Sequence, residues 1–206
     1  MTINFSQELD LVKKSRASSK HDIWMDLDIY NYSLPSVDFD MLVLVGIGGS
    51  YMGLKAAYDS FNSSKNVLFI GYSLDAIENK LKSIKGKVLI NFISKSGSTL
   101  ESKVALDRFL SYCKDNKIDY RVINTTSNRK ECDIYMPSDL VGRYSTLFVG
   151  RVLFEYLGLD FKKMIEGAKA ALSDDRTSIY ASYRYLSKKS IEIKQVYEER
   201  LISLSY

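Results

Sequence analysis

Residues 41–53 read Met-Leu-Val-Leu-Val-Gly-Ile-Gly-Gly-Ser-Tyr-Met-Gly. The unbroken apolar run from Met41 to Val45 is typical of a strand buried on both faces, as in a parallel sheet. The glycines that follow permit a tight turn, and Ser50 is placed to cap a helix over residues 51–61. Such a turn at a helix N-terminus can bind an anion, because N–H groups and the helix dipole point outward. A βα turn without a ligand is the alternative interpretation.

These glycines do not match the common nucleotide-binding patterns. A dinucleotide fingerprint needs Gly-x-Gly-x-x-Gly, but the sixth position counted from Gly46 is Tyr51. It also needs an acidic residue about 20 positions further on, whereas the next apolar run, 67–70, ends in Gly71-Tyr72-Ser73. The Gly-Lys-Ser or Gly-Lys-Thr of a Walker loop is also missing. The pattern therefore favours a smaller phosphorylated ligand.

Strand-like and helix-like patterns alternate between Asp40 and Met136. The expected strands cover residues 41–45, 67–70, 87–93, 120–124 and 132–136. Helical patterns follow the first three strands, and the one after the third strand is expected to bury Leu100, Val104, Phe109 and Cys113. This alternation predicts right-handed βαβ units in an α/β fold, a three-layer, doubly wound, five-stranded parallel sheet. Additional C-terminal helices are expected at 143–157, 161–172 and 175–189.

The flanking segments predict the domain organisation. Phe5, Leu9 and Val12 are spaced for a short helix, residues 13–20 are expected to be a loop, and residues 21–39 an ordered arm on the domain surface. Near the other end, residues 191–194 alternate like a new strand. We therefore expect an N-terminal helix and arm (1–39), a main domain with a helical extension (40–190) and the start of another domain (191–206).

Composition limits the classes of partner. The 206 residues are 46% hydrophobic and 26% charged, with a formal net charge of +4, which suits a soluble globular protein that binds small anions and gives no reason to expect nucleic acid. No signal peptide is apparent, and no apolar run approaches the roughly 20 residues that span a bilayer. Cys113 and Cys132 lack metal-site spacing and fit reduced thiols, so we expect a cytoplasmic protein without a metal site. The single histidine, His21, is expected at the surface.

Two further loops carry polar side chains that suit a phosphate site. Ser94-Lys95-Ser96-Gly97-Ser98-Thr99 follows the third expected strand and places four hydroxyls around one glycine at the start of a helix. In an open parallel sheet, ligands bind beyond the carboxyl ends of the strands where the strand order reverses, so this loop and Gly46–Ser50 should converge. In Ser138–Ser145, the guanidinium of Arg143 stays charged and could stabilise a developing oxyanion. Helix capping and a solvated arginine are the structural alternatives.

In order and spacing, these three loops resemble the motifs of one family, the bacterial type of glucose-6-phosphate isomerase. Gly46-Ile47-Gly48-Gly49-Ser50 with Gly53 resembles its first motif, and 94–101 resembles its phosphate loop. Val141-Gly142-Arg143-Tyr144-Ser145 is similar to its Gly-Gly-Arg-Tyr-Ser signature, with valine at the first position. The resemblance covers residues 24–206 and implies the fold of a sugar isomerase (SIS) domain.

The resemblance also implies roles for individual residues. Arg143 would lie near the C1–C2 end of the substrate, where an enediolate forms, and Glu101 would lie at the edge of the active site. The substrate phosphate would be bound by residues of the first two loops: Gly48, Gly49, Ser50, Ser94, Lys95, Ser96, Ser98 and Thr99. The ligand would be glucose 6-phosphate or fructose 6-phosphate, as in glycolysis and gluconeogenesis, and no cofactor would be needed.

The chain ends before the region where this family carries its catalytic base. Residues 191–201 resemble only the beginning of the family's second SIS domain, so the resemblance predicts a fragment of an enzyme that forms homodimers at full length. We therefore expect the chain alone to be inactive as an isomerase. Two alternatives stay open: a non-catalytic module that senses a sugar phosphate, and a compact isomerase of another sugar phosphate that uses a residue such as Glu101 as its base.

Overall fold

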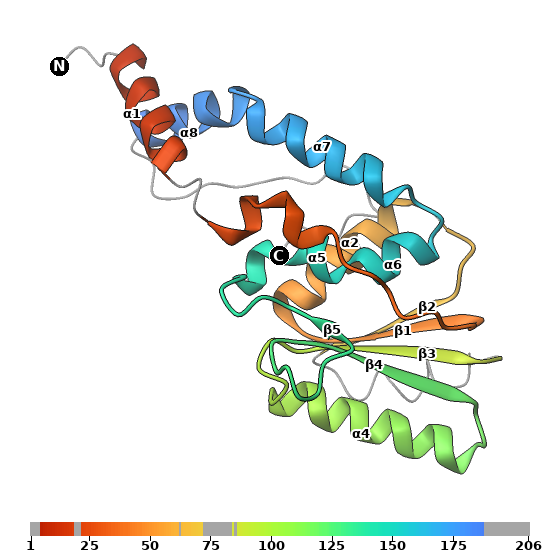
Figure 1. Cartoon of the computed structure of the whole chain (residues 1–206). Coiled ribbons are helices and arrows are strands. Elements are labelled where there is room, and N and C mark those ends of the chain that lie inside the picture. Colours follow the sequence, from red (N-terminus) through yellow and green to blue (C-terminus); the bar gives the residue numbers. More distant parts are fainter. Residues whose placement is uncertain (1–4, 19–21, 62, 72–83, 85, 188–206) are drawn as a thin grey trace. The chain divides into compact units, whose positions relative to one another are not determined.

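The computed structural model describes residues 5–18, 22–61, 63–71, 84 and 86–187 (Figure 1). They separate into two compact units. One contains Tyr32–Phe161, and the other contains the described parts of Met1–Asn31 and Lys162–Gln195. His21, most of the helix expected after the second strand and the strand expected at 191–194 lie outside the described residues. The domain boundaries after residues 39 and 190 stay predictions.

The larger unit is built on a five-stranded, all-parallel sheet in the order β2-β1-β3-β4-β5. This sheet confirms the predicted α/β fold class. The central pairs bring Val45 opposite Ile70 on one side and opposite Phe92 on the other. The strand bounds are β1 (Met41–Val45), β2 (Val67–Ile70), β3 (Val88–Ile93), β4 (Tyr120–Thr126) and β5 (Ile134–Tyr135).

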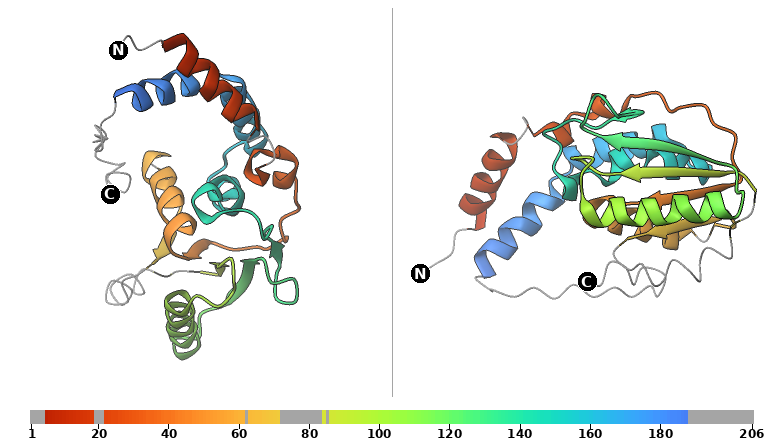
Figure 2. Two further views of the ribbon diagram at one scale, coloured as in Figure 1. Left: turned by 90° about the vertical axis from the view of Figure 1, so that its left-hand side faces the viewer. Right: turned by 90° about the horizontal axis from the view of Figure 1, so that it is seen from below.

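Helices cover both faces of this sheet. The helix α4 (Leu100–Asp115) lies on one face, and α2 (Met52–Phe61), α5 (Thr146–Val149) and α6 (Arg151–Tyr156) lie on the other (Figure 2). Alternate strand residues point to opposite faces, so every second residue of β1 and β3 packs toward α4. Val43 and Ile90 in this layer are fully buried. The three layers are those expected from the sequence.

The face of α4 that packs on the sheet differs from the expected one. Phe109 and Cys113 are fully buried, but Leu100 is 71% exposed and Val104 is 40% exposed. The buried face instead follows Ser102, Ala105, Phe109 and Cys113 at spacings of three and four residues. The prediction that Leu100 and Val104 are buried was therefore wrong, because both lie off this stripe.

The segment expected as one helix over 143–157 is divided into short elements. A 3₁₀ turn, η5 (Gly142–Tyr144), precedes α5, and Gly150 separates α5 from α6. A Cβ on Gly150 would lie 2.7 Å from Leu54 and 2.6 Å from the Thr146 carbonyl oxygen, so glycine permits this close packing. Gly158, with φ +80°, follows the end of α6, and this left-handed conformation is common just past a helix C-terminus.

The smaller unit is helical. It contains α1 (Phe5–Ser18), the 3₁₀ turns η2 (Ile23–Met25) and η3 (Leu27–Tyr30), and α8 (Arg176–Ser187), together with α7 (Phe161–Ser173) except for its first residue. The loop expected at 13–20 was wrong, because α1 continues to Ser18. Arg16 donates hydrogen bonds to the carbonyl oxygens of Leu172 and Asp174, and the second of these measures 2.6 Å. These bonds to the end of α7 hold the basic segment in a helix that its own pattern did not indicate.

Within the described ranges, no helix combines the length and the apolar character needed to cross a membrane.

Candidate functional site

The carboxyl ends of β1 and β3 are direct neighbours, and both predicted phosphate loops begin there. From β1 the chain passes to β2 on one side of the sheet, whereas β3 pairs with β1 on the other, so the strand order reverses between them. A Cβ on Gly46 would lie 3.1 Å from the carbonyl oxygen of Ile93. The structure therefore brings the Gly46–Ser50 and Ser94–Thr99 loops to one edge, as the sequence predicted.

The first loop forms a 3₁₀ turn, η4 (Gly48–Ser50), and α2 begins at Met52. Gly48 has φ +56°, a conformation that favours glycine. The N–H of Ser50 donates to the carbonyl oxygen of Ile47 at 3.1 Å, so Ser50 closes this turn and the helix starts one residue later than expected. The next residue, Tyr51, packs edge-on against Phe69 with ring centroids 5.9 Å apart, which anchors the turn over β2.

The hydroxyls of the second loop pair two by two. Ser94 Oγ lies 3.1 Å from Thr99 Oγ1, and Ser98 Oγ donates to Ser96 Oγ at 2.9 Å. Ser94 is buried, while Lys95, Ser96 and Ser98 are exposed. Thr99 occupies the N-cap position of α4 without a side-chain capping bond. Four hydroxyls thus gather at the start of a four-turn helix, where the first N–H groups have no intrahelical acceptor.

The third loop, η5, packs directly against η4. A Cβ on Gly49 would lie 1.9 Å from the Gly142 carbonyl oxygen and 3.1 Å from the Arg143 nitrogen. Only a glycine at position 49 lets the two turns approach so closely. The Arg143 side chain is exposed, and its guanidinium lies 5.4 Å from the centre of the Tyr144 ring. Below it, buried Ser145 donates its hydroxyl to the Gly142 carbonyl oxygen at 2.7 Å, which fixes the turn.

Glu101 belongs to the helix that follows the serine loop. It lies in the first turn of α4, and its side chain is exposed. The hydrogen bonds and ion pairs of the described residues do not join Glu101 to Arg143. The structure therefore brings the glycine loop, the serine loop and the Arg143 loop to one region, with Glu101 at the margin of the serine loop.

The last residue of β4 and residues of the loop that follows it reach this edge as well, and they were not predicted as site residues. Thr126 and Ser127 both donate to the carbonyl oxygen of Lys95, and the Glu131 carboxylate lies 3.7 Å from the position of a Cβ on Gly97. The strand topology could have indicated these residues. Because β4 pairs with β3 in parallel, the loop that follows β4 must lie beside the loop that follows β3. No local motif marks them.

Acidic, cysteine and histidine side chains do not gather in threes anywhere in the part of the chain that the structure describes, so no metal centre can be assigned there.

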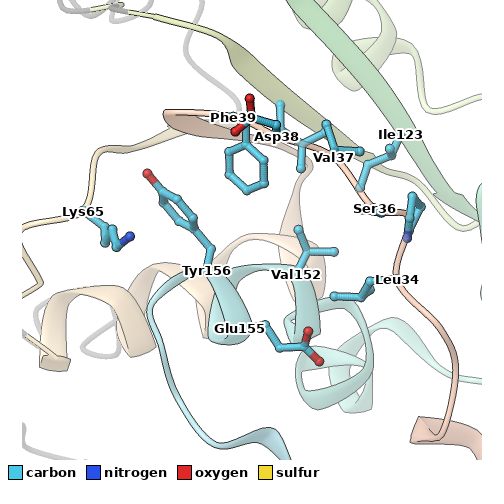
Figure 3. Close-up of a pocket in the computed structure, with 12 residues that line it drawn as sticks. Leu34, Ser36, Val37, Asp38, Phe39, Lys65, Ile123, Val152, Glu155 and Tyr156 are labelled. Carbon is cyan, nitrogen blue, oxygen red and sulfur yellow. The ribbon is translucent and has the colours of Figure 1, made fainter.

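A cavity of about 550 Å³ lies at the opposite, amino end of the strands (Figure 3). The segment 34–39 and α6 form its walls, where the rings of Phe39 and Tyr156 lie 4.9 Å apart between centroids. The Tyr156 hydroxyl donates to the Asp40 carbonyl oxygen at 2.8 Å. This cavity is separate from the three loops, because the strands lie between them.

Comparison with known proteins supports a relationship to sugar-phosphate isomerases. No family model matches the chain. The chain is 32% identical to glucose-6-phosphate isomerase of Acholeplasma laidlawii, and the match covers 86% of this chain and 53% of the relative. It is 30% identical to glucose-6-phosphate isomerase of Streptococcus pneumoniae, and that match covers 80% of this chain and 44% of the relative. A hypothetical protein from Thermus thermophilus superposes with a TM-score of 0.72 and 25% identity over 97% of this chain and 58% of that structure.

The comparisons also show how much of each relative's length this chain covers. The chain spans about half the length of the curated relatives that it matches. The match runs over most of the chain and includes the whole of the five-stranded parallel sheet. Over most of its length, the chain is therefore a distant homologue of glucose-6-phosphate isomerase.

Proposed function

We propose that this chain is the sugar-phosphate-binding half of an isomerase that interconverts glucose 6-phosphate and fructose 6-phosphate through a cis-enediol. The phosphate would lie between the Gly48–Ser50 and Ser94–Thr99 loops, where backbone N–H groups and hydroxyls can donate to its oxygens. Arg143 would face the other end of the sugar. Metal and organic cofactors have no part in this proposal, and the full-length enzyme would act as a homodimer.

One observation carries the proposal: three loops far apart in sequence meet at the switch point of the sheet. Gly46 lies against the end of β3, and Gly49 lies against Gly142 and Arg143. Distant homology to glucose-6-phosphate isomerases over most of the chain supports assigning a phosphorylated sugar to this edge. A helix N-terminus with several hydroxyls favours a phosphate over a neutral sugar.

The proposed chemistry divides between the chain and the remaining half of such an enzyme. Moving a proton between C1 and C2 needs a base over that edge of the sugar. Glu101 follows the loop that would bind the phosphate, at the opposite end of a six-carbon substrate. Arg143 would stabilise the negative charge of the enediolate, which gains most from a fixed cation in the transition state. The base would then come from the half that this chain does not cover.

A coupled assay of the purified 206-residue chain with fructose 6-phosphate tests this division. We expect at most a trace of glucose 6-phosphate, because proton transfer by a positioned group typically contributes about 10²–10⁴-fold. Glu101→Gln should leave that trace unchanged. Turnover near an ordinary enzyme rate, about 10 s⁻¹, that Glu101→Gln abolishes would contradict the proposal and support a compact isomerase instead.

A further inference from the structure

Thr126 is a buried residue at the carboxyl end of β4, next to the serine loop. Its side chain is 2% exposed, and its Oγ1 donates to the carbonyl oxygen of Lys95 at 3.1 Å. The same Oγ1 accepts a hydrogen bond from the Asn128 N–H at 3.2 Å. A threonine hydroxyl has one proton to donate and two lone pairs to accept with, so Thr126 can donate to Lys95 and accept from Asn128 at the same time.

The Lys95 carbonyl oxygen has a second donor from the same place. The N–H of Ser127 donates to it at 3.0 Å, so two neighbouring residues at the end of β4 hold this single oxygen. A carbonyl oxygen has two lone pairs, and both are engaged here. The peptide between Lys95 and Ser96 is therefore fixed from the side of β4.

Fixing this carbonyl also fixes the direction of the Ser96 N–H. A trans peptide is planar, and its C=O and N–H point in opposite directions; the described backbone contains no cis peptide. The Ser96 N–H is consequently aimed away from β4. Two other N–H groups of the loop have acceptors within it, since Gly97 donates to the Ser94 carbonyl oxygen at 3.0 Å and Ser98 donates to Ser96 Oγ at 3.1 Å.

We propose that Thr126 is a positioning residue of the phosphate loop, which holds the Lys95 carbonyl so that the Ser96 N–H donates to the bound phosphate. This inference rests on the proposed function. Thr126 does not touch the ligand itself. Without this hydroxyl the Lys95 carbonyl oxygen keeps one of the two donors that the described residues give it, the Ser127 N–H, so the Lys95–Ser96 peptide is less firmly oriented and the Ser96 donor is no longer pre-oriented.

The neighbouring residue supplies a matched control. Thr125 is 1% exposed on the same strand, and its hydroxyl donates to Asn91 Oδ1 at 2.8 Å, within the sheet and not to the loop. Thr125→Val removes one buried hydroxyl from β4 and its hydrogen bond to Asn91, and Thr126→Val removes one buried hydroxyl and its two hydrogen bonds, to Lys95 and from Asn128. Both variants therefore lose a buried hydroxyl of the same strand, whereas only Thr126→Val releases the loop.

The test is calorimetric titration of the 206-residue chain and its variants with inorganic phosphate and with glucose 6-phosphate. We expect Thr126→Val to weaken both ligands by about five- to tenfold, the effect of losing one well-placed hydrogen bond. Thr126→Ser, which keeps the hydroxyl, should restore the affinity, and Thr125→Val should stay within twofold of the unsubstituted chain. Thermal unfolding of each variant establishes that it is folded at the titration temperature.

Two results would overturn the inference: unchanged affinity in folded Thr126→Val, or an equal loss in Thr125→Val and Thr126→Val. Failure of the unsubstituted chain to bind either ligand would instead refute the proposed function, and the role of Thr126 would fall with it.

Discussion

Replacing Gly49 by alanine should lower the affinity for glucose 6-phosphate by about 10- to 100-fold, because a displaced turn loses hydrogen bonds to the charged phosphate, which contribute about 1.5–3 kcal/mol. The new Cβ would lie 1.9 Å from the Gly142 carbonyl oxygen, and Cβ atoms essentially never come closer than 3.0 Å to another heavy atom. One of the two turns must therefore move by more than 1 Å. That movement separates the glycine loop from the backbone of Arg143. Calorimetric titration of the variant measures the loss.

A glycine-to-alanine change elsewhere controls for general effects of the substitution. Gly167 lies in α7, where a Cβ would meet nothing within 4 Å, so Gly167→Ala should bind glucose 6-phosphate as the unsubstituted chain does. Overpacking at Gly49 is also expected to cost about 1–3 kcal/mol of stability, so thermal unfolding must accompany the titration. Unchanged affinity in folded Gly49→Ala would show that the contact between η4 and η5 does not position the site.

Replacing Arg143 by alanine should distinguish ligands by the charge at their C1–C2 end. Arabinonate 5-phosphate carries a carboxylate where the enediolate would develop its negative charge. A hydrogen bond to a charged group contributes about 1.5–3 kcal/mol, so Arg143→Ala should weaken this ligand by about 10- to 100-fold. Glucose 6-phosphate has no such charge and should lose less than about threefold. The two affinities are compared by calorimetry on the same preparations.

Lysine at position 143 provides the conservative comparison. It keeps the positive charge but not the planar pair of donors, so Arg143→Lys should recover part of the affinity for arabinonate 5-phosphate. An equal loss for both ligands in Arg143→Ala would mean that the guanidinium binds the ground state, for example at the phosphate. The proposed stabilisation of the enediolate would then be wrong.

The centre of the sheet could be predicted from sequence because β1 and β2 are continuous apolar runs and β3 is interrupted only by Asn91. The predicted bounds of β1 and β2 agree with the structure, and those of the other three strands differ by one or two residues at one or both ends. A strand that is buried on both faces can be recognised from its own apolar residues, without knowing which strands it pairs with. The switch point between β1 and β3 then follows from βαβ topology.

Features that depend on tertiary contacts could not be predicted in the same way. The helical state of residues 13–18 depends on Arg16 reaching carbonyl oxygens some 155 residues away in sequence, and its own pattern is basic and serine-rich. The packed face of α4 depends on which side meets the sheet, and Leu100 and Val104 offered an equally apolar alternative. When a helix has two similarly apolar faces, its sequence alone does not show which of them packs on the sheet.

The same distinction applies to the candidate site. The three loops could be predicted because glycines and hydroxyls follow strands at recognisable positions. The contact of Gly49 with Gly142 joins segments 93 positions apart, and the brace between Thr126 and Lys95 joins segments 31 positions apart. Only the paired strands and packed turns bring these partners together.

The most direct test of the central claim is the titration of glucose 6-phosphate into the 206-residue chain and into the double variant Ser96→Ala/Thr99→Ala. The claim is that the serine loop beside η4 binds the phosphate of a sugar phosphate. Loss of two hydroxyls should weaken binding at least tenfold, about 1.4 kcal/mol or more, whereas Ser173→Ala at the end of α7 should have no effect. Equal affinity in the unsubstituted chain and the folded double variant would contradict the assignment.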